Sequence, residues 1–301
     1  MINSKTCPCP YIPCKLRGNC EKCIEKSRRD HELCNCMERI AIKEYGLKLE
    51  PKQISNIIVE NNEEEVAKKS ADMLMETIRQ KPDSLICLPA GSTAIKTYEY
   101  LVKQWNEKQI DTSRVRFIAL DEWVDVKQVE ENCESFLKKH FFNHINIEKE
   151  RVRFFNTKGN LKEECTAVDE YIFKNGKIDF MLLGIGMNGH LGLNEPFDEW
   201  DQYTHVVDLD ETTKTVGQKY FSENIQLTRG ITLGIKHIFE TRTVVLQVTG
   251  AKKAPIIKKL FDSHIDFDLP ASALKLMKDA YLIMDQEAAH LIDCNSLVHL
   301  Q

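Results

Sequence analysis

The stretch "IDFMLLGIGMNGHLGLNEP", residues 178–196, decides the fold class of this chain. An apolar run of strand length ends in glycines spaced G-x-G-x-x-G, which is the pattern of dinucleotide-binding loops. Asp208 and Asp210 even follow at about the distance of a ribose-binding carboxylate, but such loops also need a helix directly after their glycines. Gly192 weakens that helix, and Pro196 stops it within two turns. We therefore interpret the stretch as a buried strand that opens a catalytic turn, and not as a nicotinamide or flavin site.

Segments on both sides of this stretch alternate between short apolar runs and amphipathic runs with helical spacing. The predicted strands cover residues 54–60, 84–90, 115–120, 152–155, 178–184, 243–250 and 280–285. The predicted helices cover residues 63–81, 91–105, 134–144, 161–175, 231–240 and 251–262. This order predicts an α/β, Rossmann-like fold with a mostly parallel sheet and helices on both of its faces. The interval 195–228 lacks such a pattern and is predicted to form active-site loops or a lid.

The composition of the 301 residues is that of a globular chain, with 42% hydrophobic and 29% charged residues. No apolar run approaches the length of a membrane span, and the first ten residues lack the apolar core of a signal peptide. We therefore expect a cytoplasmic protein without membrane contact. The net charge is −5 and no basic stripe is present, so nucleic acid is not an expected partner, whereas a homo-oligomer is compatible with the sequence.

The N-terminal 50 residues differ from the rest in charge and in cysteine content. They carry a net charge of +3, against −8 for residues 51–301. We predict a small Cys-rich module over residues 1–50 and the α/β domain over residues 51–301. Close cysteine pairs in a cytoplasmic protein favour a metal over disulfides, and structural zinc is the simplest choice. The candidate ligands, with His31 nearby, are Cys7, Cys9, Cys14, Cys20, Cys23, Cys34 and Cys36; the alternative is a tail of free thiols.

Polar residues follow three of the predicted strands, at the sheet edge where α/β proteins bind ligands. In "LPAGST", residues 88–93, Gly91, Ser92 and Thr93 begin a helix and can hold an anion such as phosphate. Simple helix capping by Ser92 or Thr93 is the alternative. The segment lacks the Gly-Lys-Ser/Thr of a nucleotide-binding P-loop, so ATP is not expected.

The other two strand ends offer groups for proton transfer. Asp121 and Glu122 follow an apolar strand, where a carboxylate can act as a general base or can instead cap a helix. His190 and Glu195 lie in the glycine turn, where a carboxylate can orient a histidine and stabilise its cation. Gly184 and Gly186 let the backbone of this turn approach a ligand closely.

Cationic side chains complete the predicted site. Arg229 in "LTRGITLG" and the pair Lys252 and Lys253 after "VVLQVTG" are candidates to hold a phosphate dianion. Arg229 is the better candidate, because surface lysine pairs are common. A phosphate cradle, a carboxylate base and a His–Glu pair together suit proton transfer on a sugar phosphate.

These motifs, in this order, resemble the glucosamine-6-phosphate deaminase and galactosamine-6-phosphate isomerase family, with 6-phosphogluconolactonases as distant relatives. The segments that carry the resemblance over residues ~53–290 are "LPAGST", "LDEWVDV", "GIGMNGHLGLNEP", "LTRGITLG" and "VTGAKKA". The "NEP" ending is similar to the deaminase and isomerase branch. The resemblance implies deamination and isomerisation of a hexosamine 6-phosphate to a ketose 6-phosphate and ammonia, with no cofactor for catalysis.

The resemblance also assigns roles to residues of this chain. It implies that Asp121 moves the C2 proton to C1 through an enolamine, and that His190, held by Glu195, opens the sugar ring. The phosphate ligands that it implies are Gly91, Ser92, Thr93, Arg229 and Lys253.

Two positions depart from the family pattern, and both lie in the predicted site. Ala90 replaces the usual Thr, which leaves the backbone donors in place. Asn188 replaces the usual Asp two residues before His190, and an amide orients a histidine but does not stabilise its cation as a carboxylate does. "LDEW" and "MNGHLGLNEP" together are similar to the galactosamine-6-phosphate branch.

A non-catalytic sugar-phosphate sensor is the alternative function, because some transcription regulators use a domain similar to this one. Residues 1–50 show no helix-turn-helix pattern, and a sensor does not need Asp121, His190 and Glu195. Only Asn188 favours the sensor.

Overall fold

The computed structural model describes residues 7, 9–30, 32–45, 47–107, 110–126 and 129–292. Its centre is a seven-stranded sheet in which every strand pairing is parallel, as the alternation of strands and helices predicts. The order across the sheet is β1 (Asn56–Glu60), β10 (Ala280–Asp285), β9 (Thr243–Val248), β6 (Phe180–Leu183), β2 (Leu85–Leu88), β3 (Arg116–Ala119) and β5 (Val152–Arg153).

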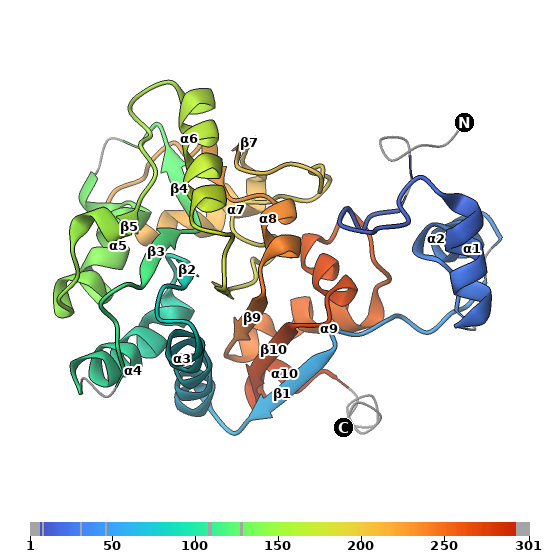
Figure 1. The fold of residues 1–301 in the computed structure, drawn as a ribbon, viewed down its shortest axis with the longest axis horizontal. Helices are drawn as coiled ribbons and strands as arrows, with labels where there is room; N and C mark the ends of the chain where they lie inside the picture. Colours follow the sequence, from blue (N-terminus) through green and yellow to red (C-terminus); the bar gives the residue numbers. More distant parts are fainter. Residues whose placement is uncertain are drawn as a thin grey trace.

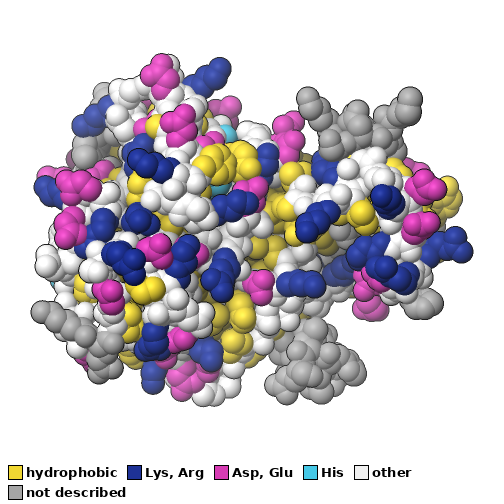
Figure 2. All heavy atoms as spheres, in the orientation of Figure 1, with side chains coloured by type: hydrophobic (Ala, Val, Ile, Leu, Met, Phe, Trp, Pro, Cys, Tyr) yellow, Lys and Arg dark blue, Asp and Glu magenta, His cyan; other side chains and the backbone are white. Residues whose placement is uncertain are grey.

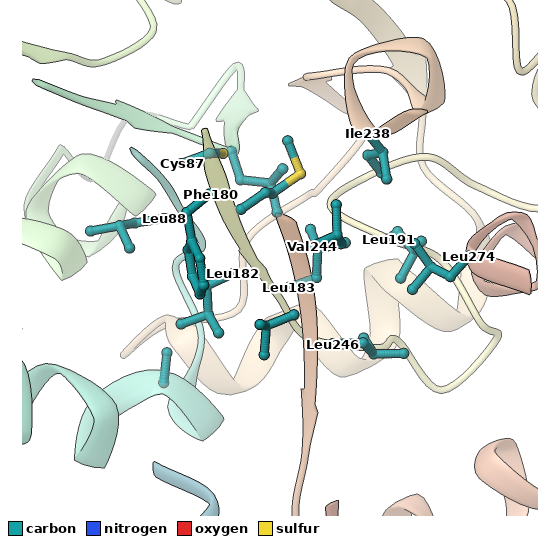
Figure 3. Close-up of a cluster of buried hydrophobic side chains, with 14 of the residues drawn as sticks. Cys87, Leu88, Phe180, Leu182, Leu183, Leu191, Ile238, Val244, Leu246 and Leu274 are labelled. Carbon is teal, nitrogen blue, oxygen red and sulfur yellow. The ribbon is translucent and has the colours of Figure 1, made fainter. Parts of the chain in front are cut away.

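The two faces of the central strands are both buried. Every residue of β2 and of β6 is inaccessible, and successive side chains of a strand point to opposite faces of the sheet. Figure 3 shows the resulting core, in which side chains of β2, β6 and β9 meet Leu191, Ile238 and Leu274 from the surrounding segments. Helices therefore cover both faces, as the composition of the strands predicts.

The covering helices follow the strands in the chain. On one side α3 packs against α4 and against strands β1, β9 and β10, as the lower part of Figure 1 shows. The α-helices of this domain are α3 (Glu63–Gln80), α4 (Ile95–Asn106), α5 (Cys133–His140), α6 (Leu161–Lys174), α7 (Glu211–Gly217), α8 (Ile235–Glu240), α9 (Ala254–Asp262) and α10 (Gln286–Ala289). Short 3-10 helices are η1 (Ser92–Ala94), η2 (Val129–Glu131), η3 (Phe142–His144), η4 (Lys149–Arg151), η5 (Gln218–Tyr220), η6 (Ala251–Lys253) and η7 (Pro270–Leu276).

A second, three-stranded antiparallel sheet was not predicted. It consists of β4 (Asp121–Val124), β8 (Arg229–Thr232) and β7 (His205–Asp208), in that order. The predicted helix over 231–240 is wrong in its first part, because residues 229–232 pair with strands on both sides and only Ile235–Glu240 is helical. The predicted irregular interval 195–228 likewise contains β7 and α7.

The chain reverses its direction of travel across the large sheet between β2 and β6. From β2 it continues to β3 and β5 on one side, and then returns to β6 on the other. Ligands of open α/β sheets bind at such a switch point, outside the carboxyl ends of the strands. The loops after β2 and β6 are "PAGST" and "GIGMNGH", so the topology alone places the site between them.

The N-terminal segment forms a separate small body at one side of the molecule (Figure 1). It contains α1 (Cys20–Arg29) and α2 (Asn35–Lys43), and Lys and Arg side chains gather on the face of this body that Figure 2 shows. The Tyr11 ring packs edge-on against Phe239 at 5.4 Å, and the His264 Nδ1 lies 3.2 Å from a carboxylate oxygen of buried Glu38. None of the helices in the described part of the chain has the length and apolar character needed to span a membrane.

Candidate active site

A pocket lies at the switch point and gathers most of the predicted site residues. The loops after β2 and β6, the start of β4, the turn after β9 and the segment α7–η5 all contribute to its wall. The predicted residues that line it are Gly91, Ser92, Thr93, Asp121, Gly184, Gly186, Asn188, His190 and Lys253. Glu195 lies directly behind Asn188 and His190, whereas Arg229 does not line the pocket.

The loop after β2 forms the anion-binding wall. Gly91 precedes η1, which continues into α4, so backbone N–H groups of residues 92–94 begin a helical segment at the pocket. Gln247 of β9 donates a hydrogen bond to the Thr93 carbonyl at 2.7 Å and accepts one from buried Thr97 at 2.8 Å. This buried pair fixes the loop to the neighbouring strand.

Two lysines face this wall. Lys253 at the end of η6 is anchored on the Ile185 carbonyl at 2.5 Å, and Lys219 in η5 lies 4.8 Å from the centre of the Tyr220 ring. Burial and the nearby positive charge of Lys219 lower the pKa of Lys253 to about 8. A dianion bound between the two ammonium groups would remove their repulsion, as expected of a phosphate site.

Arg229 lies elsewhere, on the first residue of β8. Its guanidinium donates two hydrogen bonds to the Asp125 carboxylate, at 2.8 and 3.1 Å, and both side chains are largely exposed. The predicted role of Arg229 at the phosphate therefore has no support from its position. Lys219, which the sequence analysis missed, is the second cation of the pocket.

Asp121 and Glu122 are adjacent in β4 but have different surroundings. The Glu122 carboxylate accepts backbone N–H groups of Trp123, Cys133 and Glu134 at 2.8–2.9 Å, so it holds the start of α5 against β4. Asp121 lines the pocket instead. Burial, and then the neighbouring Glu122 charge, raise the pKa of Asp121 to about 7, against a smaller lowering by a hydrogen bond from the Cys133 thiol. Asp121 is thus suited to exchange protons near neutral pH.

The glycine turn brings His190 to the opposite wall. The Gly186 N–H donates to the His190 carbonyl and the Gly189 N–H to the Gly186 carbonyl, which closes a tight turn. The imidazole lies so close to Gly186 that a Cβ at this position would be 2.4 Å from Nε2. Gly186 is therefore required for the close approach of the ring, which explains part of the glycine spacing.

The other ring nitrogen of His190 is held from behind. Nδ1 lies 3.0 Å from the Thr213 hydroxyl and 3.4 Å from Glu195 Oε2. Burial raises the pKa of Glu195, but interactions with His190, Thr213 and Asn188 outweigh it and leave this pKa below its usual value. Glu195 is therefore ionised at neutral pH, and a His190 cation has a buried counter-charge.

The cysteines of the N-terminal segment cluster without a recognisable metal site. The Cys34 and Cys36 sulfurs lie 3.4 Å apart, and Cys9 accepts a weak hydrogen bond from Asn35. All seven cysteines are free thiols, and His31 lies outside the described residues. Within the ranges that the structure describes, no three His, Cys, Asp or Glu side chains are arranged to hold a metal ion.

Four pocket or near-pocket residues have no clear signal in the sequence: Lys219, Thr213, Asp210 and Cys133. Three of them lie in or beside the helical part of the interval 195–228, away from the ends of the predicted strands. Their polar side chains are also typical of any solvated loop. Only the topology shows that α7 and η5 close one side of the pocket.

Comparison with known proteins gives consistent matches over most of the chain. The family described as glucosamine-6-phosphate isomerases/6-phosphogluconolactonase matches residues 60–283. A glucosamine-6-phosphate deaminase of Bacillus pumilus is 36% identical over 241 residues, which are 78% of this chain and 99% of the relative. One of a Thermoanaerobacter species is 36% identical over 248 residues, which are 81% of this chain and 98% of the relative.

Solved structures agree. A monomeric glucosamine-6-phosphate deaminase superposes with a TM-score of 0.75 at 30% identity, over 78% of this chain and 99% of that one. A 6-phosphogluconolactonase of Thermotoga maritima has a TM-score of 0.62 at 16% identity, over 76% of this chain and 99% of the other. The second likeness shows the fold alone. Neither curated relative nor either structure matches the whole of this chain.

Proposed function

This chain belongs to the family of glucosamine-6-phosphate isomerases and 6-phosphogluconolactonases, and we propose from this premise that it deaminates and isomerises a hexosamine 6-phosphate to a ketose 6-phosphate and ammonia. The single observation that carries the proposal is the shared pocket. It places two mutually repelling lysines beside a helix start, with a buried carboxylate and a histidine on its other walls. Apart from the Asn188 noted in the sequence, no observation on the described residues and none of the comparisons favours the non-catalytic sensor.

The phosphate is bound by the loop after β2 and by two cations. Gly91, Ser92 and Thr93 supply backbone and hydroxyl donors, and Lys253 supplies the first positive charge. We assign the second positive charge to Lys219, because Arg229 is engaged with Asp125 outside the pocket.

Asp121 is the general base of the isomerisation. In its ionised form it takes the proton from C2 of the open-chain substrate and returns it to C1, and an enolamine is the intermediate between the two steps. Hydrolysis of the resulting C2 imine releases ammonia and leaves the ketone. The pKa of about 7 makes Asp121 a stronger base than an exposed aspartate, yet one of which about half is ionised at neutral pH.

His190 opens the sugar ring before this transfer. Its Nδ1 is engaged with Thr213 and Glu195, so Nε2 near Gly186 is the nitrogen available to move the proton between the ring oxygen and the anomeric hydroxyl. Glu195 stabilises the cation that forms when His190 accepts a proton.

The test is an assay of ammonia and ketose 6-phosphate from both glucosamine 6-phosphate and galactosamine 6-phosphate. We expect product from one or both, and the ratio of the two kcat/KM values identifies the epimer. Asp121→Asn and His190→Gln should each lose at least about 100-fold, a typical general acid–base contribution. Asp208→Asn, an exposed carboxylate outside the pocket, is the matched control. No product from either sugar would overturn the proposal.

We also propose that the Cys-rich segment binds a structural zinc ion. Burial, and then the neighbouring Cys34 sulfur, raise the pKa of Cys23 to about 11, and burial with the same neighbour raises that of Cys36 to about 12. Two thiolates this close repel each other, so a cation bound between them would favour their ionised forms. Metal analysis of the full chain should find bound zinc in the wild type and none in Cys34→Ser/Cys36→Ser. A wild-type protein without bound zinc would overturn this proposal.

A further inference from the structure

Asn188 joins the backbone of His190 to two carboxylates that lie behind the histidine. Its Oδ1 accepts the His190 backbone N–H at 3.2 Å, which fixes the orientation of the amide. Its Nδ2 then points at two carboxylates, 2.8 Å from Glu195 Oε2 and 3.3 Å from Asp210 Oδ1. The Thr213 hydroxyl is a third acceptor, 3.5 Å from the same nitrogen, and the two carboxylates are the closer partners of its two hydrogens.

Asp210 is joined to the catalytic histidine by a second route. It is the N-cap of α7 and accepts the Thr212 N–H at 2.8 Å. The next residue, Thr213, is the one whose hydroxyl lies 3.0 Å from His190 Nδ1. The Asp210 N–H in turn lies 3.3 Å from Glu195 Oε1. Asp210 therefore fixes both partners of His190. It holds Glu195 through the Asn188 amide and through the Asp210 N–H, and it holds Thr213 by capping α7.

We propose that Asp210 is a positioning residue for His190 and that Asn188 and Asp210 act as one unit, in which the amide bridges the Glu195 and Asp210 carboxylates. The inference rests on the role proposed above for His190, but its central measurement needs no substrate.

The physical reason for the pairing is electrostatic. An oxygen in place of Nδ2 would put an acceptor within 3.3 Å of two ionised carboxylates, so an Asp at 188 would be repelled by both Glu195 and Asp210. Burial raises the pKa of Asp210, yet hydrogen bonds from Thr212 and Asn188 outweigh it, so Asp210 is ionised at neutral pH. The other charged groups nearby are His190, Glu195, and Lys214 and Glu211 on α7; Asp198 accepts the Glu195 N–H.

The experiment is a double-mutant cycle with Asn188→Asp, Asp210→Asn and the swapped pair Asn188→Asp/Asp210→Asn. Asn caps helices as well as Asp does, so Asp210→Asn removes the charge and keeps the cap. The first readout is the pKa of His190, titrated by NMR without substrate. We expect Asn188→Asp to raise it by about one unit, Asp210→Asn to lower it, and the swap to return it close to wild type.

The second readout is kcat/KM for hexosamine 6-phosphate. Asn188→Asp should lose about tenfold or more, and the swapped pair should recover most of this loss, a coupling expected only of residues in contact. Asn188→Asp/Asp208→Asn is the matched control: it removes an exposed carboxylate two residues away and should not rescue. A swapped pair that loses as much kcat/KM as the two single variants combined, or an Asp210→Asn variant that leaves the His190 pKa at its wild-type value, would overturn the inference. If the wild type has no activity but the His190 pKa shifts in the variants as expected, only the proposed function is refuted.

Discussion

At the level of single residues, the pocket buries ionisable groups and so moves the pKa of two of them, Asp121 and Lys253, to values near neutral pH. Asp121 becomes a stronger base because the pocket wall and Glu122 disfavour its charge. The Lys253 ammonium group holds its proton less tightly because it is buried and faces Lys219. Both shifts cost folding free energy, and the shift of Lys253 is relieved in part when an anionic phosphate binds beside it.

These two shifts predict the pH dependence of activity. Asp121 must be ionised to act as a base, so kcat/KM should fall as the pH drops below about 7. Lys253 must be protonated to hold phosphate, so kcat/KM should also fall above about pH 8. Bound phosphate raises the pKa of Lys253, so the alkaline fall should be weaker in kcat. Initial rates from pH 5 to 10 measure both limbs, and an acid limb centred near pH 4 would contradict the assignment of Asp121.

The same burial predicts that the base destabilises the folded chain. The folded pKa of Asp121 lies above its unfolded value of 3.8, so the folded state binds the proton more tightly and stability is lost as the pH rises from about 4 to 7. Asp121→Asn should therefore be more stable than wild type by about 2–4 kcal/mol at pH 8, with a smaller gain at pH 5. Denaturant unfolding at both pH values measures this. Asp208→Asn is the exposed control, and a destabilised Asp121→Asn at pH 8 would contradict the prediction.

Most of the site residues predicted in the α/β domain line the pocket, because the chemistry lies at strand ends that an apolar pattern reveals. Gly91, Asp121 and His190 each follow a run whose burial the structure confirms. Arg229 was selected instead as a cation flanked by a glycine and an apolar segment, yet that segment is a strand of the second sheet, and the guanidinium binds Asp125. Lys219 follows no strand, so nothing in the pattern distinguishes it from a surface lysine.

At the level of secondary-structure elements, segments with one consistent period were predicted well and segments with mixed signals were not. The buried strands of the large sheet and helices such as α3 have a single pattern and are where the sequence predicts them. "RGIT" is too short to show a period, and its apolar residues continue into α8 at helical spacing. Its strand conformation comes from pairing with β4 and β7, which is tertiary information.

The position of η5 and β8 relative to the pocket predicts which cation binds phosphate. Lys219→Ala should raise KM for the sugar phosphate by about 10–100-fold, since a charged hydrogen bond contributes about 1.5–3 kcal/mol. Arg229→Ala should change KM less than about twofold, because it breaks only an exposed ion pair. Lys219→Arg, which keeps the charge, should retain most of the affinity. A larger effect of Arg229→Ala than of Lys219→Ala would restore the role that the sequence analysis gave to Arg229.

At the level of the whole molecule, the N-terminal segment contacts the α/β domain away from the active site. Its contacts include the edge-on packing of Tyr11 on Phe239 of α8 and the 3.2 Å contact of buried Glu38 with the His264 imidazole, just after α9. None of the described residues before Pro89 lines the pocket. The segment is therefore placed to affect the stability of the α/β domain rather than its chemistry.

This arrangement predicts that stability and activity separate at the contact. Tyr11→Ala removes an aromatic pair worth about 0.5–1.5 kcal/mol beyond its buried area, and should lower the Tm by about 2–6 °C. Its kcat/KM should stay within about twofold of wild type, because neither Tyr11 nor Phe239 lines the pocket. Tyr45→Ala, at a position where the side chain is 75% exposed, is the control and should leave the Tm unchanged. Thermal unfolding and initial rates of the full chain test this, and a Tyr11→Ala variant with normal Tm but reduced kcat would show instead that the segment communicates with the active site.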